Sequence, residues 1–388
     1  MGVELLHKKK ELAPQLRFEE FDKNWEKKEL KDFTKINQGL QIAISERFSE
    51  KVEDTLFYIT NEFLRKGAKK SYFIKDPPQS VICNEDDLLM TRTGNTGQVV
   101  TGVHGAFHNN FFKIKFDSSC EKWFLFYFLT SFRTQHTILK LAGTSTIPDL
   151  NHGDFYKIKI NIPDFPEQQK IASFLSAVDE KIQQLTRKKE LLEQYKKGVM
   201  QQLFCGKLRF KDENGKAFPK WEEKRLGDVL DYIQPTKYLV ASTEYDDSYP
   251  TPVLTAGKTF ILGYTNETND IYNENLPVII FDDFTTATQF VDFPFKAKSS
   301  AMKILVSKKG ENIRYLYEAI RLIKFEIGGH GRHWISQFSI FNIPYPCIEE
   351  QQKIANYLSN IDNKIESITK QITQTQTFKK GLLQQMFV

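Results

Sequence analysis

Four short polar stretches of the sequence combine side chains that can form paired hydrogen bonds. Residues 92–98 hold an arginine, an asparagine, a glutamine and two glycines, and residues 144–151 hold hydroxyls and an asparagine. Stretches 285–289 and 328–333 bring threonines, a glutamine, histidines and an arginine to comparable places in the second half. Arginine can donate twice to guanine O6 and N7, and asparagine or glutamine can pair with adenine N6 and N7. These are the residue types that base-edge reading needs.

For any single residue of these stretches, an ordinary solvated turn is the alternative explanation. The grouping, with two stretches at corresponding places in each half, favours a surface that reads DNA bases. The candidate side chains are Arg92, Thr93, Asn95, Thr96, Gln98, Thr144, Ser145, Thr146, Asn151, Thr285, Thr286, Thr288, Gln289, His330, Arg332 and His333.

No other stretch carries a recognisable catalytic arrangement. The sequence has no GxxxxGK[ST] phosphate loop, no GxSxG elbow and no HExxH or similarly tight spacing of histidines. Asp76-Pro77-Pro78 resembles an amino-methyltransferase loop, but Gln79 follows where an aromatic ring would stack on a flipped base. No glycine fingerprint for S-adenosylmethionine lies upstream. We therefore expect no catalytic residue, metal or cofactor in this chain.

A sequence repeat indicates which elements position the polar stretches. Residues 167–172, Glu-Gln-Gln-Lys-Ile-Ala, recur as residues 350–355, and the match continues without a gap at a constant offset. Asp179 thereby corresponds to Asp362, and Lys196 corresponds to Lys379. The parts that precede the two copies look unrelated to each other. A constant module beside a variable one is typical of an adaptor with two different readers.

Each copy predicts a long helix. The first begins after Pro166, which suits a first helical turn, and runs to about Phe204 before Gly206 ends it. Apolar residues recur every seven positions in both copies, which is the pattern of a coiled-coil seam. The seam residues are Ile171, Val178, Leu185, Leu192 and Val199, then Ile354, Ile361, Ile368 and Leu382, with Thr375 as an interruption.

A helix with a narrow apolar seam needs a partner, and the other copy is the nearest candidate. In an antiparallel pair, both ends of each variable part meet at one place, whereas a parallel pair needs a connection that runs back the whole helix. Antiparallel pairing therefore predicts two domains at opposite ends of a spacer, related by a pseudo-two-fold axis. The alternative is two amphipathic helices that each lie on their own domain's core.

Basic clusters also fall on these helices, at 187–189, 196–197 and 379–380. A solvated helix face is the simpler interpretation. Contact with DNA phosphates is the alternative, and substitution of Lys196 or Lys197 would then weaken DNA binding uniformly.

The variable parts predict an α+β fold, with two mixed α/β domains separated by the two long helices. Expected strands are Thr55–Thr60, Asp87–Thr91, Asn110–Phe116, Lys157–Ile162, Val278–Phe281 and Met302–Val306, and expected helices are Lys122–Leu141 and Glu311–Phe325. The expected organisation is a tail at 1–14, domains at 15–165 and 207–345, and helices at 166–206 and 346–388.

Composition sets outer bounds on function. The chain has 388 residues, 40% hydrophobic and 27% charged, which predicts two or three globular domains. A net charge of +5 permits a polyanionic partner. The four cysteines form no CxxC pair, which argues against a zinc site or a disulfide framework and fits a reducing cytoplasm. No apolar run is long enough to predict a membrane span.

The repeated residues resemble a known family. Residues 167–172, followed by Leu-Ser-x-x-Asp-x-Lys-Ile at 175–182, occur twice, with Pro166 before the first copy. This repeated pattern resembles the specificity subunit of type I restriction-modification systems. The Leu-Arg-Phe triplets at 16–18 and 208–210, and Thr-x-x-x-Leu-Asn at 146–151, are also similar to that family. The second half departs from the pattern, because it carries Gly-Gly-His-Gly-Arg-His-Trp instead of the Thr-x-x-x-Leu-Asn element.

The resemblance implies a non-catalytic subunit with two target-recognition domains that read a bipartite, asymmetric site in double-stranded DNA. It implies two methyltransferase (modification) subunits that bring S-adenosylmethionine and methylate adenine, and two restriction/translocase subunits that use ATP and Mg²⁺. Two other classes stay open: a self-contained restriction-methylation enzyme with an unrecognised catalytic centre, and a coiled-coil scaffold that binds only proteins.

Overall fold

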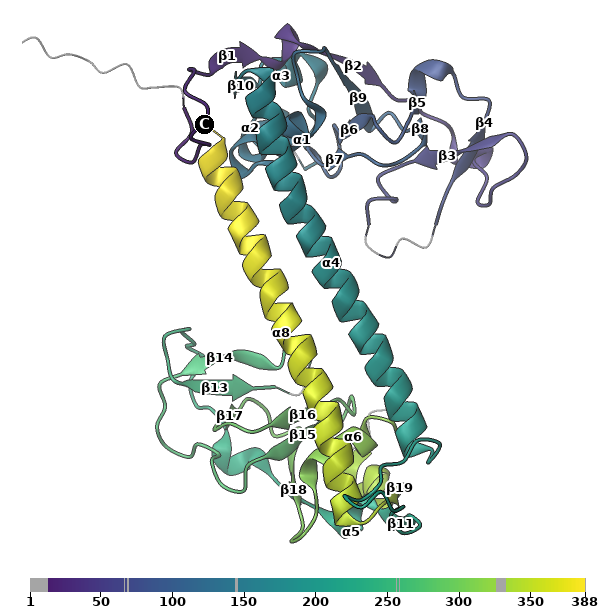
Figure 1. The fold of residues 1–388 in the computed structure, drawn as a ribbon, viewed down its shortest axis with the longest axis vertical. Helices are drawn as coiled ribbons and strands as arrows, with labels where there is room; N and C mark the ends of the chain where they lie inside the picture. The colour runs from purple at the N-terminus through teal and green to yellow at the C-terminus, as the bar shows by residue number, and fades with distance from the viewer. Residues whose placement is uncertain are drawn as a thin grey trace, which may run out of the picture. The chain divides into compact units, whose positions relative to one another are not determined.

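The computed structural model describes residues 13–65, 67, 70–143, 146–255, 257, 259–325 and 333–387. The chain forms two compact units: Met1–Thr186 with Lys370–Val388 is unit 1, and Arg187–Thr369 is unit 2. The division runs through both long helices, α4 (Phe165–Phe204) and α8 (Ile348–Met386). Each unit therefore contains the beginning of one long helix and the end of the other (Figure 1).

Unit 1 builds on three small sheets, with strand orders β1-β10, β2-β9-β6-β7 and β4-β3-β8-β5. The strands are β1 (Glu26–Glu29), β2 (Thr34–Gln38), β3 (Thr55–Ile59), β4 (Phe73–Lys75), β5 (Ile82–Cys83), β6 (Leu88–Thr91), β7 (Val99–Val100), β8 (Gly105–Phe107), β9 (Phe111–Phe116) and β10 (Lys159–Ile162). The helices are α1 (Lys122–Thr130), α2 (Phe132–Ala142) and α3 (His152–Tyr156), with 3-10 turns at Leu30–Asp32, Ile44–Glu46 and Gln79–Val81.

Unit 2 has the corresponding sheets β11-β19, β12-β18-β15-β16 and β14-β13-β17. Its strands are β11 (Glu222–Arg225), β12 (Leu230–Ile233), β13 (Thr251–Leu254), β14 (Ile261–Thr265), β15 (Val278–Asp282), β16 (Thr288–Val291), β17 (Lys296–Ala297), β18 (Met302–Ser307) and β19 (Asn342–Tyr345). Its helices are α5 (Leu226–Val229), α6 (Ile313–Ile320) and α7 (His333–Ser336), with 3-10 turns at Pro235–Tyr238 and Phe338–Ile340.

The two units share most of their strand topology although their sequences look unrelated; β5 of unit 1 has no counterpart among the described strands of unit 2. The sheets β2-β9-β6-β7 and β12-β18-β15-β16 are antiparallel throughout, and each ends in a hairpin, β6–β7 or β15–β16. Each second sheet contains one parallel pair, β3–β8 or β13–β17. In each unit the first strand pairs with the last one before the long helix, β1 with β10 and β11 with β19. The mixed α/β fold is therefore as the sequence predicts.

The ends of the long helices belong to the cores of the units. In unit 1, Ile171 and Leu175 of α4 join Leu382 and Met386 of α8 in one apolar cluster with the strands and short helices. Unit 2 has the reciprocal arrangement, in which the beginning of α8 and the end of α4 enter one core. The apolar residues at the helix ends therefore pack on domain cores, and each core holds residues of both long helices and not of one alone.

All predicted seam residues are buried or half-buried. The buried ones are Ile171, Leu185, Val199, Ile354, Ile361, Ile368 and Leu382, and the half-buried ones are Val178 and Leu192.

All six predicted strands are confirmed to within two residues, as β3, β6, β9, β10, β15 and β18. One helix prediction is wrong, because Lys122–Leu141 is two helices. Ser131 has an extended backbone and its side chain accepts a hydrogen bond from the Thr134 N–H, so it ends α1 and caps α2. The helix predicted at Glu311–Phe325 is shorter, since Asn312 caps α6 and the helix ends at Ile320.

Several predictions fall outside the described residues: the tail up to residue 12, and the side chains Thr144, Ser145, His330 and Arg332. In the described part of the chain, no helix is both long and apolar enough to cross a membrane.

Candidate nucleic-acid interface

The first predicted reading loop is the turn of the β6–β7 hairpin. Gly94 and Gly97 have φ values of +88° and +89°, a backbone region that glycine adopts without penalty. The Thr91 hydroxyl donates to the Asn95 carbonyl oxygen and accepts the Gln98 N–H at 2.9 Å. These hydrogen bonds within the turn stabilise its conformation. Asn95 and Gln98 are exposed.

Arg92 ties this hairpin to the second predicted loop. Its Nε lies 2.9 Å from Asp149 Oδ1 and its Nη2 lies 2.6 Å from Asp149 Oδ2. The Leu150 N–H donates to the Arg92 carbonyl oxygen at 2.8 Å. The two stretches that the sequence singled out in the first half are thus in direct contact, through an aspartate that sequence reasoning missed.

The remaining predicted side chains of unit 1 have mixed environments. Thr96 is buried, and its hydroxyl donates to the Pro148 carbonyl oxygen at 2.7 Å. Asn151 caps α3, since its Oδ1 accepts the Asp154 N–H at 2.9 Å. Thr146 is exposed and Thr93 is half-buried. Thr96 and Asn151 therefore shape the loops, while Asn95, Gln98 and Thr146 present polar atoms to solvent.

A glutamine on α2 supports the hairpin from the side. Gln135 Nε2 donates to the Gly97 carbonyl oxygen at 2.8 Å and to the Leu129 carbonyl oxygen at 2.6 Å. A Cβ on Gly97 would lie 2.9 Å from Ile138 Cγ2, so glycine is needed there for close approach as well as for its backbone angle. No pattern in the sequence indicated Gln135.

The first predicted loop of unit 2 is the equivalent β15–β16 turn. Asp282 Oδ1 accepts the N–H groups of Phe284 at 2.8 Å and Thr285 at 3.1 Å. Thr286 has a φ of +58°. Thr285 is exposed, and Thr286 is half-buried. Beyond the turn, Thr288 and Gln289 lie on the edge strand β16 and are half-buried.

A buried aspartate ties this second hairpin to the segment that begins at His333. Asp283 is 1% exposed; its carbonyl oxygen accepts the His333 N–H at 3.0 Å and its Oδ1 accepts the Trp334 N–H at 2.9 Å. Its Oδ2 lies 3.3 Å from Nζ of Lys303, which is fully buried. His333 itself is 6% exposed. The predicted stretches of the second half therefore also meet, again through an aspartate that sequence reasoning missed.

The repeated residues at the start of each long helix anchor it to its unit. Glu167 is buried and accepts Arg17 Nε at 2.8 Å, Arg17 Nη2 at 2.7 Å and Trp25 Nε1 at 3.2 Å. The hydrogen bond with Glu167 raises the pKa of Arg17, so the guanidinium stays charged.

The second copy repeats these bonds. Glu350 accepts Arg209 Nε at 3.1 Å, Arg209 Nη2 at 2.6 Å and Trp221 Nε1 at 2.7 Å. The joint recurrence of Arg, Trp and Glu in the sequence was the signal for this contact.

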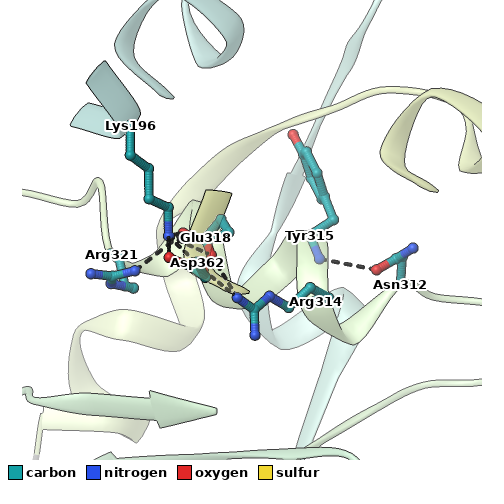
Figure 2. A network of polar contacts seen from close by, with 7 residues as sticks. All are labelled: Lys196, Asn312, Arg314, Tyr315, Glu318, Arg321 and Asp362. Carbon is teal, nitrogen blue, oxygen red and sulfur yellow. Dashed lines mark hydrogen bonds and ion pairs between the residues drawn. The ribbon is translucent and has the colours of Figure 1, made fainter. Parts of the chain in front are cut away.

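The prediction that Lys196 lies on a solvated face, or on phosphate, is wrong. Lys196 is 6% exposed and its Nζ lies 2.8 Å from both carboxylate oxygens of Asp362 and 3.1 Å from Glu318 Oε1 (Figure 2). Arg314 and Arg321 also pair with Glu318, which is fully buried (Figure 2). The charge is therefore already neutralised inside unit 2.

Unit 1 contains the equivalent contact. Lys379 Nζ lies 2.6 Å from Asp179 Oδ1, and the Tyr127 hydroxyl donates to Asp179 Oδ2 at 2.9 Å. Burial raises the pKa of Tyr127 above its ordinary value of 10, so this hydroxyl keeps its proton. The lysine–aspartate correspondence in the repeat thus marks an ion pair between the two long helices within each unit.

No metal centre is apparent in the part of the chain that the structure describes, where no three His, Cys, Asp or Glu side chains are grouped to hold an ion. What the loops offer instead is hydrogen-bonding side chains on braced hairpins.

Comparison with known proteins agrees with this geometry. The chain matches the family model of the type I restriction modification DNA specificity domain twice, over residues 22–194 and 219–376. The EcoR124I/EcoR124II specificity subunit of Escherichia coli is 47% identical over 163 residues, which are 40% of this chain and 40% of that protein. The MjaVIII specificity subunit of Methanocaldococcus jannaschii is 27% identical and covers 93% of this chain and 91% of its own length.

Among solved structures, the S subunit of a type I restriction-modification system from M. genitalium has a TM-score of 0.67 at 17% identity. The match covers 97% of this chain and 99% of that one, so the fold is shared along the whole length. Since the family model also matches both halves, the chain belongs to the family of type I restriction-modification DNA specificity subunits.

Proposed function

We propose that each unit reads one half of an asymmetric, bipartite sequence in double-stranded DNA. The observation that carries this proposal is the pair of equivalent hairpins, β6–β7 and β15–β16, each tied by a charged residue to the segment that precedes the unit's last strand. Both hairpins are bonded to the segment before the last strand, but the side chains in their turns differ. Equivalent positions with different side chains would read different bases, so the two half-sites differ.

Within unit 1, the side chains proposed to reach base edges are those that face solvent. Asn95 and Gln98 carry amides of the type that pairs with adenine N6 and N7. Arg92 contributes to the same surface, and its ion pair with Asp149 fixes the hairpin that presents Asn95. In unit 2, the proposed side chains are Thr285 in the equivalent turn and Gln289 on the edge strand β16. His330 and Arg332 are proposed from the sequence alone.

We propose further that α4 and α8 pair as an antiparallel coiled coil that sets the unread gap. In each unit an ion pair joins the beginning of one long helix to the end of the other, Asp179 with Lys379 and Asp362 with Lys196. Both contacts fit antiparallel helices and a pseudo-two-fold repeat. Two readers on one face of a duplex would sit about one helical turn apart, roughly 34–36 Å.

The chemistry would come from partner subunits. Two modification subunits would bring S-adenosylmethionine and flip the target adenine out of the duplex. Two restriction/translocase subunits would supply ATP-driven translocation and cleavage with Mg²⁺. A solved structure with a similar fold, at a TM-score of 0.51, concerns complex assembly and conformational transition of the type I R-M system, which supports a role inside a larger assembly.

Genome-wide sequencing of methylated adenine tests the proposal. The host would carry the neighbouring modification subunit, with and without this chain, and expression of both proteins would be verified. We expect one gapped motif with two different halves, methylated only when the chain is present. A methylome that does not change when the chain is added would contradict the proposal.

A further inference from the structure

Helix α2 carries positive charge that no carboxylate of the described residues neutralises. Arg133, His136 and Lys140 are exposed along it, and its sequence contains no Asp or Glu. Among the described residues, neither Arg133 nor Lys140 forms an ion pair, whereas Arg17, Arg92 and Lys113 of the same unit each do. An exposed cationic helix face without paired carboxylates is suited to an anionic partner.

The three basic side chains share one face of the helix. With 3.6 residues per turn, Arg133, His136 and Lys140 fall in a stripe about 60° wide. Arg133 and Lys140 are seven residues apart, which is about 10.5 Å along the helix axis. Successive phosphates of one DNA strand advance by roughly 3.4 Å along the duplex. The two side chains are thus spaced to contact phosphates about three steps apart.

Helix α2 lies beside the hairpin that is proposed to read DNA, so the DNA backbone is the anion that it would meet. Gln135, which lies about 100° around α2 from His136, donates to the Gly97 carbonyl oxygen of the β6–β7 hairpin at 2.8 Å. An open groove of about 540 Å³ lies between hairpin and helix, and its lining includes Asn95, Gln98, Gln135 and Leu139. Leu139 lies beside the basic stripe on the helix surface. A duplex whose bases reach Asn95 or Gln98 would therefore bring its backbone to α2.

We propose that α2 of unit 1 binds the phosphodiester backbone of the duplex through Arg133 and Lys140. This inference rests on the proposed reading of DNA by the β6–β7 hairpin and adds a sequence-independent contact beside it. Phosphate contacts fix the register of a protein on DNA but carry no base information. Helix α2 would hold the duplex while the hairpin reads it.

The experiment measures DNA binding by the full chain in complex with its modification partner, over a range of salt concentrations. The ligand is a duplex that carries the sequence found by methylation sequencing, and a second duplex has its first half-site scrambled. The variant is Arg133→Ala with Lys140→Ala. Each phosphate contact contributes roughly 0.9 to the slope of log affinity against log salt, so the slope should fall by about 1.8. The fold-loss of affinity should be equal on both duplexes.

The matched control is Lys35→Ala with Lys115→Ala. These exposed lysines face each other across β2 and β9, toward the opposite end of the sheet from the hairpin, and neither forms an ion pair among the described residues. The control should leave the slope unchanged. An unchanged slope in the α2 variant, or an equal fall in the control, would overturn the inference.

A loss confined to the unscrambled duplex would also overturn it, because that result assigns base reading to α2. If the wild-type complex binds both duplexes equally, the proposed reading of this half-site is wrong. The inference, which rests on that reading, is then wrong as well. Retention of the full slope by Arg133→Lys would confirm that charge, and not a specific guanidinium geometry, makes the contact.

Discussion

Arg92 and Asp283 occupy the same position in the two units. Each residue follows the first strand of a hairpin, β6 or β15, and each accepts a backbone N–H through its carbonyl oxygen. The donors are Leu150 at 2.8 Å and His333 at 3.0 Å, in the segments that precede the last strands. The Thr-x-x-x-Leu-Asn element of unit 1 and the segment ending in His-Trp of unit 2 therefore meet their hairpins at equivalent positions, despite unrelated sequences.

Substitution of Arg92 by alanine should weaken recognition of one half-site only. The change removes the link to Asp149 and loosens the hairpin that holds Asn95. The pair is partly exposed, at 22% and 44% for the two side chains, so the stability cost should be below about 1 kcal/mol. Binding of duplexes mutated in one half-site at a time measures the effect. Equal losses on both half-site mutants would contradict the assignment, and Asp149→Asn is the matched test of the link.

Replacement of Glu167 by glutamine should destabilise unit 1. Arg17, with a side chain 15% exposed, would face a neutral amide in place of a buried carboxylate. Breaking a buried pair on one side costs about 3 kcal/mol. Urea denaturation gives the free energy of unfolding. Lys170→Ala is the control, because its pair with Glu20 is about half exposed on both sides and should cost less than about 1 kcal/mol. A Glu167 variant as stable as that control would refute the anchoring role.

Lys196→Met should lower stability without changing the salt dependence of DNA binding. The substitution leaves Asp362 and the fully buried Glu318 without their lysine, which costs about 3 kcal/mol. Lys197, its exposed neighbour, is the matched position, and Lys197→Met should leave stability within about 0.5 kcal/mol of wild type. If the Lys196 variant shows a smaller slope of log DNA affinity against log salt concentration, Lys196 contacts a phosphate and this account of its role is wrong.

Unit 1 should lose stability in mild acid through His108. Burial, and then the charge of Arg47, lower the pKa of His108 from 6.5 to about 4. Between these values the unfolded chain binds a proton that the folded chain does not. The contribution of His108 is therefore complete above about pH 6.5 and is lost as pH falls toward 4. Denaturation of the wild type and of His108→Gln at pH 7 and pH 4.5 tests this. The variant should show the smaller drop, and identical drops would exclude His108 as the cause.

Helices and strands with clear periodicity could be predicted from this sequence, whereas the contacts that brace the loops could not. The period-seven apolar pattern predicts α4, and the β-branched and aromatic runs predict β9 and β18. Asp149, Asp283 and Gln135 have no such signal, because their role depends on segments brought together by the fold.

The burial of individual charged side chains on the long helices was the feature hardest to predict from the sequence. Lys196 and Lys197 are adjacent and chemically identical, yet only Lys196 is buried. The repeat held the information, since Lys196 and Asp362 recur together as Lys379 and Asp179. As a specificity subunit, the chain contributes DNA recognition. The two lysine–aspartate pairs give a physical reason for the repeat of the helical segments.

The central claim is that each unit reads its own half-site. The most direct test is adenine-methylation sequencing in hosts that carry Asn95→Ala with Gln98→Ala, or Thr285→Ala with Gln289→Ala, beside wild type. We expect the first variant to relax or change only one half of the gapped motif and the second variant only the other half. If either variant changes both halves, or if both variants change the same half, the assignment of one reader to each unit is wrong.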